Sequence, residues 1–333
     1  MTRAARPLLW PLVPAYRLAL ALREVQLRTG LKPVRRLHRP VVSIGNIAAG
    51  GAGKTPLTIA LARALTARGV VVDVLSRGYG RRSALPLSVG LGGTAEEFGD
   101  EPLEIAREAG VPVYVAAERY EAGVLAERSA LPGFGLHLLD DGFQHRQLHR
   151  EVDILLLRRG DLHDRLLPAG NLREALRAAE RASVFAIPED EPEVADWIQA
   201  QGWERPVWRL RRRMDVPPVE GPVVAFCGIA RPEQFFAGVE GAGLRVAARL
   251  AFADHHRYSA GDLERIGAEV RKAGAAALLT TEKDRVRLGD LAANLPASVP
   301  LLAVPLRVEI ENEAAAVEWL MDRVREVPCL EGR

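Results

Sequence analysis

The glycine-rich segment between residues 48 and 55 has the residue types of a phosphate-binding loop. It consists of Ala48, Ala49, Gly50, Gly51, Ala52, Gly53, Lys54 and Thr55. Glycines let backbone N–H groups close around phosphate oxygens, and the N-terminus of a following helix adds the positive end of its dipole. In such a Walker A loop the Lys54 ammonium contacts the β- and γ-phosphates and the Thr55 hydroxyl binds Mg²⁺. Ala48 departs from the pattern, which has glycine at its first position.

The surroundings of this loop distinguish a phosphate site from an incidental glycine-rich turn. The apolar run Val41–Ile44 predicts a strand before it, and leucines at 57, 61 and 65 predict a helix over Pro56–Arg68 after it. Strand, loop and helix in that order are the context of a P-loop. We therefore predict that this segment binds a nucleoside triphosphate.

Two adjacent carboxylates, Asp140 and Asp141, follow the apolar run Leu136–Leu139. A carboxylate at the tip of a strand is what a Walker B site uses to hold Mg²⁺. Asp-Asp-Gly is also a common turn sequence, so the motif gains its meaning from the P-loop upstream. Because side chains alternate along a strand, the two carboxylates are expected to do different jobs.

The elements around these motifs alternate between strands and helices. Such alternation predicts an α/β fold, with a P-loop NTPase-type, mostly parallel sheet covered by helices. The further strands expected in the first domain are Val70–Leu75, Val111–Val115, Val152–Leu157 and Ser183–Ile187, with helices over Glu101–Ala109 and Arg119–Arg128. A second pattern predicts strands over Val223–Cys227, Val246–Phe252, Ala275–Thr280 and Leu301–Pro305, and helices over Pro232–Ala242, Ala260–Lys272 and Asn312–Val327.

The break between the two patterns lies at residues 203–221, which are basic and rich in proline. We interpret this stretch as a linker or hinge. The expected organisation is therefore an N-terminal segment (1–38), a P-loop nucleotide-binding domain (39–202), the hinge (203–221) and a smaller C-terminal α/β domain (222–330).

Charge is distributed unevenly along the chain. Residues 1–39 contain nine Lys or Arg and one acid, a net +8, although the whole protein has only +2. An apolar stretch with Trp10 and Tyr16 lies in the same segment, and its length is too short to span a membrane. This composition favours a helix lying on an anionic membrane surface over one packed only on its own domain. Nucleic acid is not an expected partner, because no nucleic-acid module accompanies the charge.

Composition excludes a wholly disordered chain, a collagen-like repeat and a multi-span membrane protein. Hydrophobic residues are 48% and charged residues 26%, as in an ordinary globular protein. Two cysteines, Cys227 and Cys329, cannot form a disulfide framework, which favours a reducing compartment. Cys227, in an apolar strand, is expected to be an inert core thiol.

A series of strings in this order resembles the tetraacyldisaccharide 4'-kinase family, the lipid A 4'-kinases of Gram-negative bacteria. The resemblance extends from about residue 8 to residue 325, and its most specific strings are Ser76-Arg77-Gly78-Tyr79-Gly80 and Asp140-Asp141-Gly142-Phe143-Gln144-His145. The other strings are Gly45-Asn46, Gly50–Pro56, Gly99-Asp100-Glu101-Pro102, Leu167–Gly170, Leu172-Arg173-Glu174, Gly228–Pro232, Ala253-Asp254-His255 and Thr281–Asp284. Asn171 departs from the proline that other members often have, which leaves the local turn open.

The resemblance implies that ATP phosphorylates the 4'-hydroxyl of a tetraacylated glucosamine disaccharide 1-phosphate, a lipid A precursor, at the cytoplasmic face of the inner membrane. It implies Asp100 as the base and His255, from the second domain, as its assistant. An Asp–His pair is physically reasonable because the imidazole can position the carboxylate. Asp100 as a simple N-cap, His255 as a structural histidine and His256 as the true participant remain open.

Further residues are expected near the substrate on the same resemblance. Arg77, Arg173 and Glu174 are candidates for contact with phosphate or sugar, with an exposed salt bridge as the alternative. Gln144 and His145 are also candidates, although His145 would equally cap a loop, and Phe143 is expected in the core. The Thr281–Asp284 string is expected to line either the hinge side or the base pocket.

Three other functions compete with a lipid kinase. A GTPase-like maturation factor would read guanine with Asn-Lys-x-Asp, and here Thr281 replaces the asparagine. A soluble small-metabolite kinase would not need the basic N-terminus. A non-enzymatic membrane adaptor would leave the P-loop unexplained. No protein partner is expected to be required.

Overall fold

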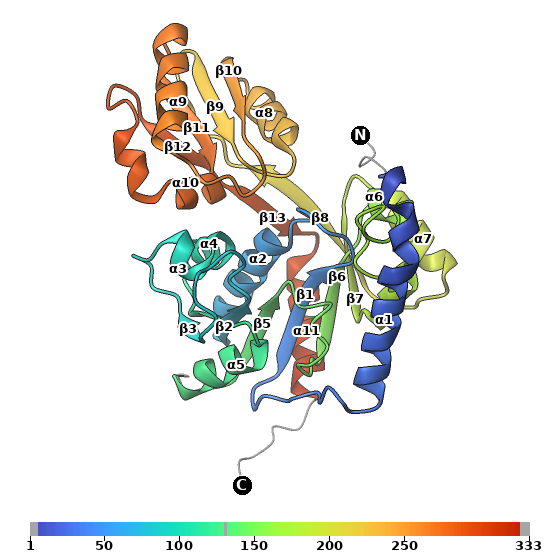
Figure 1. Cartoon of the computed structure of the whole chain (residues 1–333). Helices are drawn as coiled ribbons and strands as arrows, with labels where there is room; N and C mark the ends of the chain where they lie inside the picture. Colours follow the sequence, from blue (N-terminus) through green and yellow to red (C-terminus); the bar gives the residue numbers. More distant parts are fainter. Residues whose placement is uncertain (1–5, 130–131, 327–333) are drawn as a thin grey trace.

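Two sheets organise the chain in the computed structural model, which describes residues 6–129 and 132–326 (Figure 1). The larger sheet has nine strands in the order β13-β8-β7-β6-β1-β5-β2-β4-β3. Only the β3–β4 and β8–β13 pairs are antiparallel. The strands are β1 (Val41–Asn46), β2 (Val71–Ser76), β3 (Leu87–Ser88), β4 (Val113–Val115), β5 (Gly135–Asp140), β6 (Val152–Leu156), β7 (Val184–Pro188), β8 (Val207–Met214) and β13 (Leu306–Ile310).

Helices cover both faces of this sheet because its central strands carry buried apolar side chains on both faces. Val42 and Ile44 of β1 belong to a core with α2 and α11, whereas Val41 packs with α5 on the opposite face. The helices of this domain are α1 (Val13–Arg28), α2 (Lys54–Thr66), α3 (Ala95–Phe98), α4 (Asp100–Ala109), α5 (Arg119–Arg128), α6 (Arg159–Leu162), α7 (Pro192–Ala200) and α11 (Glu313–Arg325), with 3₁₀ turns η1 (Pro7–Leu12) and η2 (Leu176–Arg181). The mostly parallel α/β sheet expected from the alternation is confirmed.

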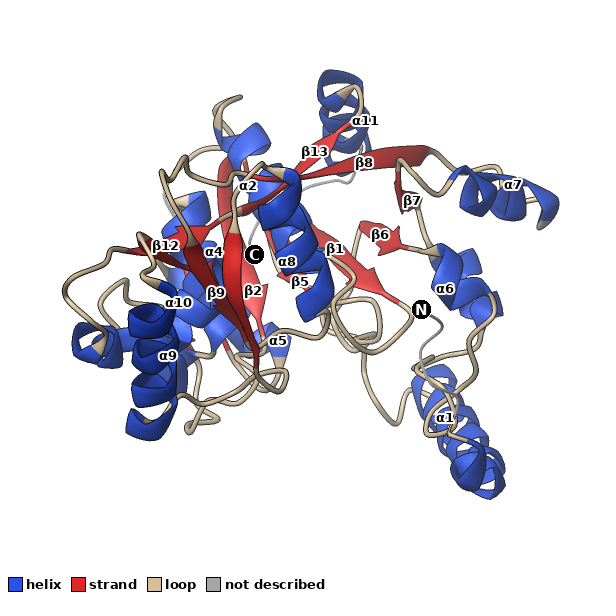
Figure 2. Ribbon diagram, turned by 90° about the horizontal axis from the view of Figure 1, so that it is seen from above, coloured by secondary structure: helices blue, strands red, loops and turns tan. Residues whose placement is uncertain are grey.

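The second sheet has four parallel strands in the order β10-β9-β11-β12. Its elements are β9 (Val223–Cys227), β10 (Val246–Ala251), β11 (Ala277–Thr281), β12 (Leu301–Val304), α8 (Pro232–Gly241), α9 (Ala260–Ala273), α10 (Glu282–Leu288) and η3 (Gly289–Asn294). Helices α8 and α9 pack on opposite faces of the sheet (Figure 2). Cys227 is buried in β9, where burial raises the pKa of its thiol to about 12, so it is an inert core residue as expected.

The expected domain boundaries need correction. Residues 207–214, interpreted as part of a linker, form β8 of the large sheet, and the chain returns from the second sheet through β13 to α11, which packs in the first domain. Arg209, Arg211 and Arg213 of β8 lie on its more exposed side, where Arg211 pairs with Glu189 at 2.8 Å and Arg209 lies 3.8 Å from Glu311. Arg212 lies on the other side and donates to the carbonyl of Ala52 in the P-loop. Trp208 and Leu210, which alternate with Arg209 and Arg211 along the strand, point into the core. The second domain therefore spans about 222–305 rather than 222–330, of which residues 327–330 lie outside the described part.

Helix α1 lies along one side of the large domain rather than forming a separate unit (Figure 1). Val13, Tyr16 and Leu20 pack against the core that contains β6 and β7. Leu18 and Leu22, on the other side of the helix, are 61% and 55% exposed. The helix therefore has two apolar faces, one of which is covered by the protein. Across residues 6–129 and 132–326, no helix combines the length and hydropathy needed to cross a bilayer.

A buried ionic cluster crosses the middle of the large sheet. His137 of β5 is fully buried, with Nδ1 2.6 Å from Asp73 and Nε2 3.5 Å from Glu127. Burial alone would lower the pKa of His137, but the hydrogen bonds to the two carboxylates outweigh it and raise that pKa. This cluster joins β2, β5 and α5 through charge rather than apolar packing.

Candidate active site

The P-loop leaves the carboxyl end of β1, between β5 and β6, and is braced by a distant segment. The N–H of Ala49 donates to the carbonyl of Asn171 at 2.7 Å, and the N–H of Arg173 donates to the carbonyl of Ile47 at 2.8 Å. Ala48 is fully buried and pairs with Leu172, and its φ is not positive, so alanine fits where the pattern has glycine.

The turn left open at Asn171 is now defined. The Asn171 side-chain amide donates to Asp164 at 2.9 Å, and its backbone N–H donates to the same carboxylate at 3.2 Å. These bonds fix the segment whose carbonyl braces the P-loop. The departure from proline therefore replaces a rigid ring with a side-chain hydrogen bond.

Lys54 is the first residue of α2 and lies in the position that its motif predicts. Its ammonium is nearly buried, 3.1 Å from Asn46 Oδ1 and 3.5 Å from Asp141 Oδ1. Because lysine has three N–H donors, the ammonium can exchange these oxygens for phosphate oxygens. The loop therefore has a cation at the helix N-terminus, where an anion is expected to bind.

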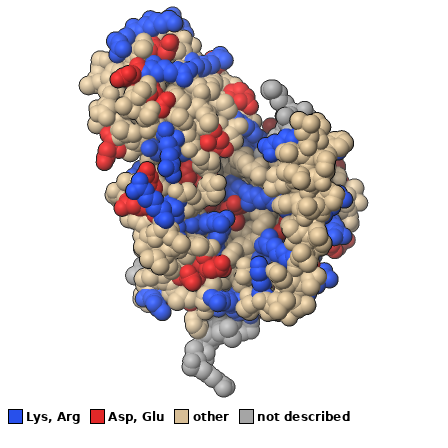
Figure 3. All heavy atoms as spheres, in the orientation of Figure 1, with Lys and Arg blue, Asp and Glu red and all other residues tan. Residues whose placement is uncertain are grey.

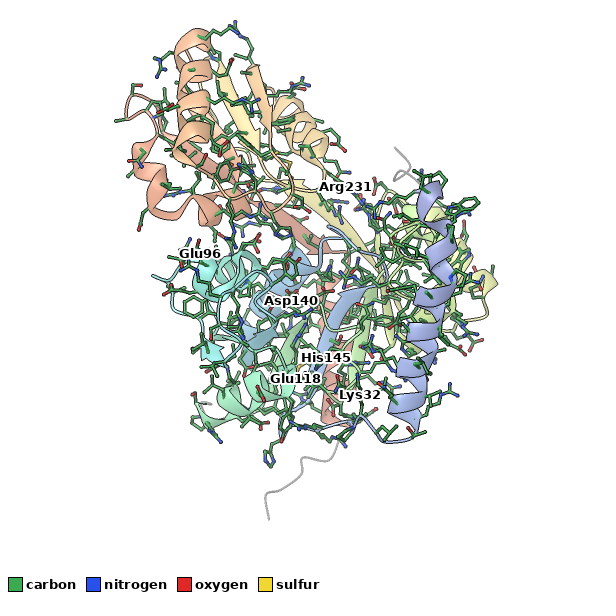
Figure 4. All side chains as sticks on the ribbon, viewed as in Figure 1. Lys32, Glu96, Glu118, Asp140, His145 and Arg231 are labelled. Carbon is green, nitrogen blue, oxygen red and sulfur yellow. The ribbon has the colours of Figure 1, made fainter. Side chains whose placement is uncertain are left out.

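The two carboxylates of the Asp-Asp pair have different surroundings, because Asp140 is the last residue of β5 and Asp141 follows it in a turn with positive φ. Asp140 ends β5 and is fully buried; its Oδ1 accepts from the Thr58 hydroxyl at 3.0 Å and its Oδ2 has no hydrogen-bond partner. Burial raises the pKa of Asp140 to about 7, with Glu101 and Asp141 adding to the effect. Figure 4 shows Asp140 at the centre of the large domain.

Asp141 belongs to a network of charges on the other side. Its carboxylate accepts from Arg173 Nη1 at 3.0 Å at both oxygens, and the same nitrogen donates to Gln144 Oε1 at 3.0 Å. Burial alone would raise the pKa of Asp141, but the charges of Lys54 and Arg173 outweigh it and lower that pKa. Asp141 is thus a permanent anion held between two cations.

The end of β1 and the turn after Asp141 are in unusually close contact. A Cβ built on Gly45 would lie 2.5 Å from the Cβ of Phe143 and 2.7 Å from its backbone nitrogen. Phe143 is fully buried, as expected, and Arg181 stacks on its ring with the guanidinium carbon 4.7 Å from the centroid. Gly45 therefore sets how closely the phosphate loop approaches the carboxylates.

Asp100 and His255 meet across the two domains. Asp100 begins α4 and is nearly buried, and its Oδ2 lies 3.1 Å from His255 Nδ1. Burial opposes ionisation, yet the hydrogen bond from His255 and the charge of Arg287 hold the pKa of Asp100 well below its usual range. The hydrogen bond to Asp100 in turn raises the pKa of His255.

The neighbouring histidine faces elsewhere. His256 Nε2 lies 3.0 Å from Asp262, and its ring stacks on Phe252 with centroids 4.8 Å apart. It belongs to the interior of the second domain, so the geometry distinguishes His255 from His256 as the partner of Asp100.

Two glycines let the loop after β2 pack on the start of α4. Gly78 and Gly99 both have positive φ, and a Cβ on Gly99 would lie 3.0 Å from the Gly78 Cα. The same loop brings the ring of Tyr79 to 5.9 Å from that of His255. The Ser-Arg-Gly-Tyr-Gly string thus lines the place where Asp100 and His255 meet.

The Thr281–Asp284 string lies at a contact between the two domains. Lys283 Nζ lies 2.6 Å from Glu101 Oε1 on α4, so it joins the two domains. Asp284 is fully buried and accepts from the Thr281 and Tyr258 hydroxyls at 2.6 and 3.0 Å. The string is therefore the contact of the second domain with α4.

Comparison with known proteins identifies this arrangement. The family model described as tetraacyldisaccharide-1-P 4'-kinase matches residues 5–325. The chain belongs to the tetraacyldisaccharide-1-P 4'-kinase family. It is 43% identical to the tetraacyldisaccharide 4'-kinase of Koribacter versatilis, over 93% of this chain and 97% of that protein, and 37% identical to that of Chromobacterium violaceum, over 96% and 94%. A crystal structure of LpxK from Aquifex aeolicus in complex with ATP is 32% identical, with a TM-score of 0.76 over 96% of this chain and 99% of that chain.

Family membership settles the class of reaction. The protein is a tetraacyldisaccharide 4'-kinase, a phosphotransferase of lipid A biosynthesis. The GTPase-like factor, the soluble small-metabolite kinase and the membrane adaptor considered from the sequence are thereby set aside.

A cationic cluster beside the Asp-Asp pair of this 4'-kinase combines Arg77, a candidate from the sequence, with Arg119, which sequence reasoning missed. Arg119, at the start of α5, is 7% exposed, and its Nε is buried without a hydrogen-bond partner. Burial lowers the pKa of Arg119 to about 10, and the nearby charge of Arg77 adds to the effect. Figure 3 shows Lys and Arg gathered along the central hollow of this face. The only local signal was an arginine at a helix N-terminus, where cations are unfavourable.

The remaining candidates are divided between this cluster and structural contacts. His145 is kept neutral, because burial lowers its pKa to about 3 and Arg119 adds to the effect, and its Nε2 is buried without a partner. Gln144 Nε2 donates to the carbonyl of Asn46 at 2.8 Å, which ties the turn to β1. Glu174 is nearly buried and pairs with Arg181 at 2.5 Å, the salt bridge considered as its alternative.

Helix α1 contacts the loops that carry these residues. The Tyr16 hydroxyl donates to the carbonyl of Arg173 at 2.8 Å, and Arg23 donates to the carbonyl of Gln144. The basic N-terminal helix therefore supports the active site directly from its protein-facing side.

Proposed function

We propose that this kinase transfers the γ-phosphoryl group of ATP to the 4'-hydroxyl of a tetraacylated glucosamine disaccharide 1-phosphate, with Lys54 holding the phosphates. The observation that carries the proposal is the position of Lys54 Nζ, 3.5 Å from Asp141 at the mouth of a braced P-loop. The glycines of the loop and the N-terminus of α2, which begins at Lys54, adjoin this lysine in the chain. The related LpxK was crystallised with ATP, which supports ATP as the donor.

The residues beside the P-loop fit a magnesium ion. Thr55, Asp140 and Asp141 offer hydroxyl and carboxylate oxygens, the ligands that Mg²⁺ prefers. Asp140 Oδ2 is buried without a hydrogen-bond partner, which is costly unless a cation occupies the space next to it. When bound with ATP, Mg²⁺ would neutralise charge on the phosphates.

Asp100 orients the acceptor hydroxyl in this proposal. Phosphoryl transfer has a loose transition state, so the carboxylate needs to align the hydroxyl and take its proton late, rather than deprotonate it beforehand. A carboxylate with a low pKa is suited to that task, because it remains an acceptor throughout. His255 and the second domain cover it, which excludes water from the phosphates.

Side chains with unpaired nitrogens beside the Asp-Asp pair bind the lipid substrate in this proposal. Arg77 is exposed and Arg119 and His145 have buried nitrogens without partners, so a ligand with anionic or hydroxyl oxygens would satisfy them. A phosphorylated disaccharide offers both. The chemistry of the site therefore matches that of a lipid A precursor.

Helix α1 holds the enzyme at the anionic surface where such a lipid lies. Its uncovered face carries Leu18, Leu22 and Val25, each more than half exposed, and Leu8 before it is 93% exposed. Apolar side chains on one face with Lys and Arg nearby are typical of helices that lie in the membrane interface. We place the protein peripherally, at the cytoplasmic face of the inner membrane.

Incubation with radiolabelled ATP and the tetraacylated disaccharide 1-phosphate tests the proposal, with GTP as the control nucleotide. We expect label in the lipid from ATP, no transfer by Lys54→Ala, and a fall in kcat of about a hundredfold or more for Asp100→Asn with little change in ATP affinity. Near-normal turnover by Lys54→Ala would refute the loop assignment. Equal losses of kcat and ATP affinity in Asp100→Asn would make Asp100 structural.

A further inference from the structure

Arg287 is a third donor to the Asp100 carboxylate. It lies on α10 of the second domain, and its Nε is 2.9 Å from Asp100 Oδ2, the oxygen that also lies 3.1 Å from His255 Nδ1. The other oxygen, Oδ1, accepts from the backbone N–H of Glu101 at 3.0 Å. Both oxygens of the carboxylate are thus oriented by named donors.

The guanidinium is anchored independently of Asp100. Arg287 Nη1 donates to the carbonyl of Gly228 at 2.5 Å and to Asp284 Oδ1 at 3.2 Å. Asp284 is fully buried and is itself held by the hydroxyls of Thr281 and Tyr258. Removing Asp100 would therefore leave Arg287 in place, whereas removing Arg287 would leave Asp100 Oδ2 with the half-exposed His255 as its remaining side-chain donor.

Arg287 and His255 contribute differently to the orientation of Asp100. The Arg287 side chain is 6% exposed and that of His255 is 42% exposed. An arginine keeps its charge at every working pH and has a planar, fixed set of donors, whereas a half-exposed imidazole can rotate and lose its proton. Arg287 Nη2 also lies 3.2 Å from His255 Nδ1, but both nitrogens donate to Asp100 Oδ2, so the guanidinium and the imidazole meet at that oxygen rather than bonding to each other.

We propose that Arg287 is a positioning residue for phosphoryl transfer, which aims the Asp100 carboxylate at the acceptor hydroxyl and completes the base only when the second domain is docked on α4. The inference rests on the proposed role of Asp100. It gives the domain contact a chemical purpose: Lys283 joins α10 to Glu101, and Arg287, one turn further along the same helix, orients the base.

Substitution of Arg287 tests the role, with a matched control on the same helix. We expect Arg287→Gln to lower kcat by about 30- to 100-fold with KM for ATP within about twofold, and Arg287→Lys to recover part of the loss. Arg285 is exposed two residues earlier, and Arg285→Gln should behave as the wild type. Thermal unfolding of each variant shows whether it is folded.

The pH profile adds a readout that a structural role would not move. The charged groups facing Asp100 are His255 from the loop after β10, Arg287 and Lys283 from α10, and Glu101 and the buried Glu104 on its own helix. Without the Arg287 charge the pKa of Asp100 should rise, because the carboxylate loses a cation that favours its ionised form, so the ¹³C NMR signal of the Asp100 carboxyl should titrate at a higher pH in Arg287→Gln than in Arg285→Gln. An unchanged titration of this carboxyl would overturn the inference.

A double-mutant cycle separates this inference from the role of Asp100. If Arg287 acts through Asp100, then Arg287→Gln in an Asp100→Asn background should cost less than about threefold further. Additive losses, or a folded Arg287→Gln variant with wild-type kcat beside an inactive Asp100→Asn, would overturn the inference and leave the proposed base intact. An active Asp100→Asn variant would overturn the proposed role of the base itself.

Discussion

Substitution of Gly45 by alanine is expected to reduce turnover without touching substrate. The new Cβ would lie 2.5 Å from the Phe143 Cβ and 2.7 Å from its backbone nitrogen, whereas ordinary contact begins near 3.4 Å. The turn after β5 must therefore move by about 1 Å, since neither partner is a flexible side-chain end. Asp141 lies two residues before Phe143, so the carboxylates move away from the P-loop.

The expected loss follows from that displacement. Overpacking of this kind costs about 1–3 kcal/mol of unfolding free energy, and a misplacement of about 1 Å at a phosphoryl-transfer site costs about a hundredfold in kcat. Thermal unfolding and lipid phosphorylation by the same preparation measure both quantities. Gly160→Ala is the control, because a Cβ there meets nothing within 4 Å. Wild-type kcat in a folded Gly45→Ala protein would refute the claim that this contact sets the distance between the two motifs.

Two further predictions concern stability and membrane binding. His137→Gln should cost about 3 kcal/mol at pH 6, because the buried Asp73 and the partly buried Glu127 lose a cationic partner. The pKa of His137 is raised in the folded protein, so this stabilisation is complete below the unfolded value of 6.5 and is lost as pH rises through the folded value. Urea unfolding from pH 6 to 9 should therefore show the difference in unfolding free energy between wild type and variant becoming smaller. A difference that grows with pH would contradict a protonated His137. The double change Leu18→Gln and Leu22→Gln should weaken binding to anionic vesicles by about a hundredfold, from about 1.5 kcal/mol for each leucine, and leave the packed face of α1 intact. Leu91→Gln, at an equally exposed leucine of the β3–α3 loop, is the control, and unchanged sedimentation of the double variant would exclude α1 as the docking face.

The parts of the site that the sequence predicted are local in the chain. The P-loop needs only a strand, eight residues and a helix, and Asp140 needs only the strand that it ends, so their positions follow from neighbouring residues. The meeting of Asp100 and His255, 155 residues apart, was expected only through a family resemblance. Local patterning contains no information about which helix of one domain docks on the other.

Residues whose roles depend on distant partners were missed for the same reason. Arg119 and Arg287 are two arginines among many, and only the fold shows that the Nε of Arg119 is buried without a hydrogen-bond partner and that Arg287 donates to Asp100. For Arg287 a signal was present, because it lies four residues after Lys283 and three after Asp284, on one side of a helix. The domain boundary was misplaced because the arginines of β8 resemble a linker when only their own segment is considered. Their acidic partners, Glu309 of β13 and Glu311 just after it, are about a hundred residues further along the chain.

The antiparallel pair of β8 and β13 has a mechanical consequence. Met214, where the chain departs for the smaller lobe, is paired with Leu306, where it comes back, so both crossings leave from a single point of the larger sheet. Two adjacent connections let the smaller lobe pivot about that point as a hinge, while each connection prevents free rotation about the other. Because the smaller lobe is inserted between β8 and β13, a growing polypeptide cannot complete the larger sheet until almost the entire chain has been synthesised.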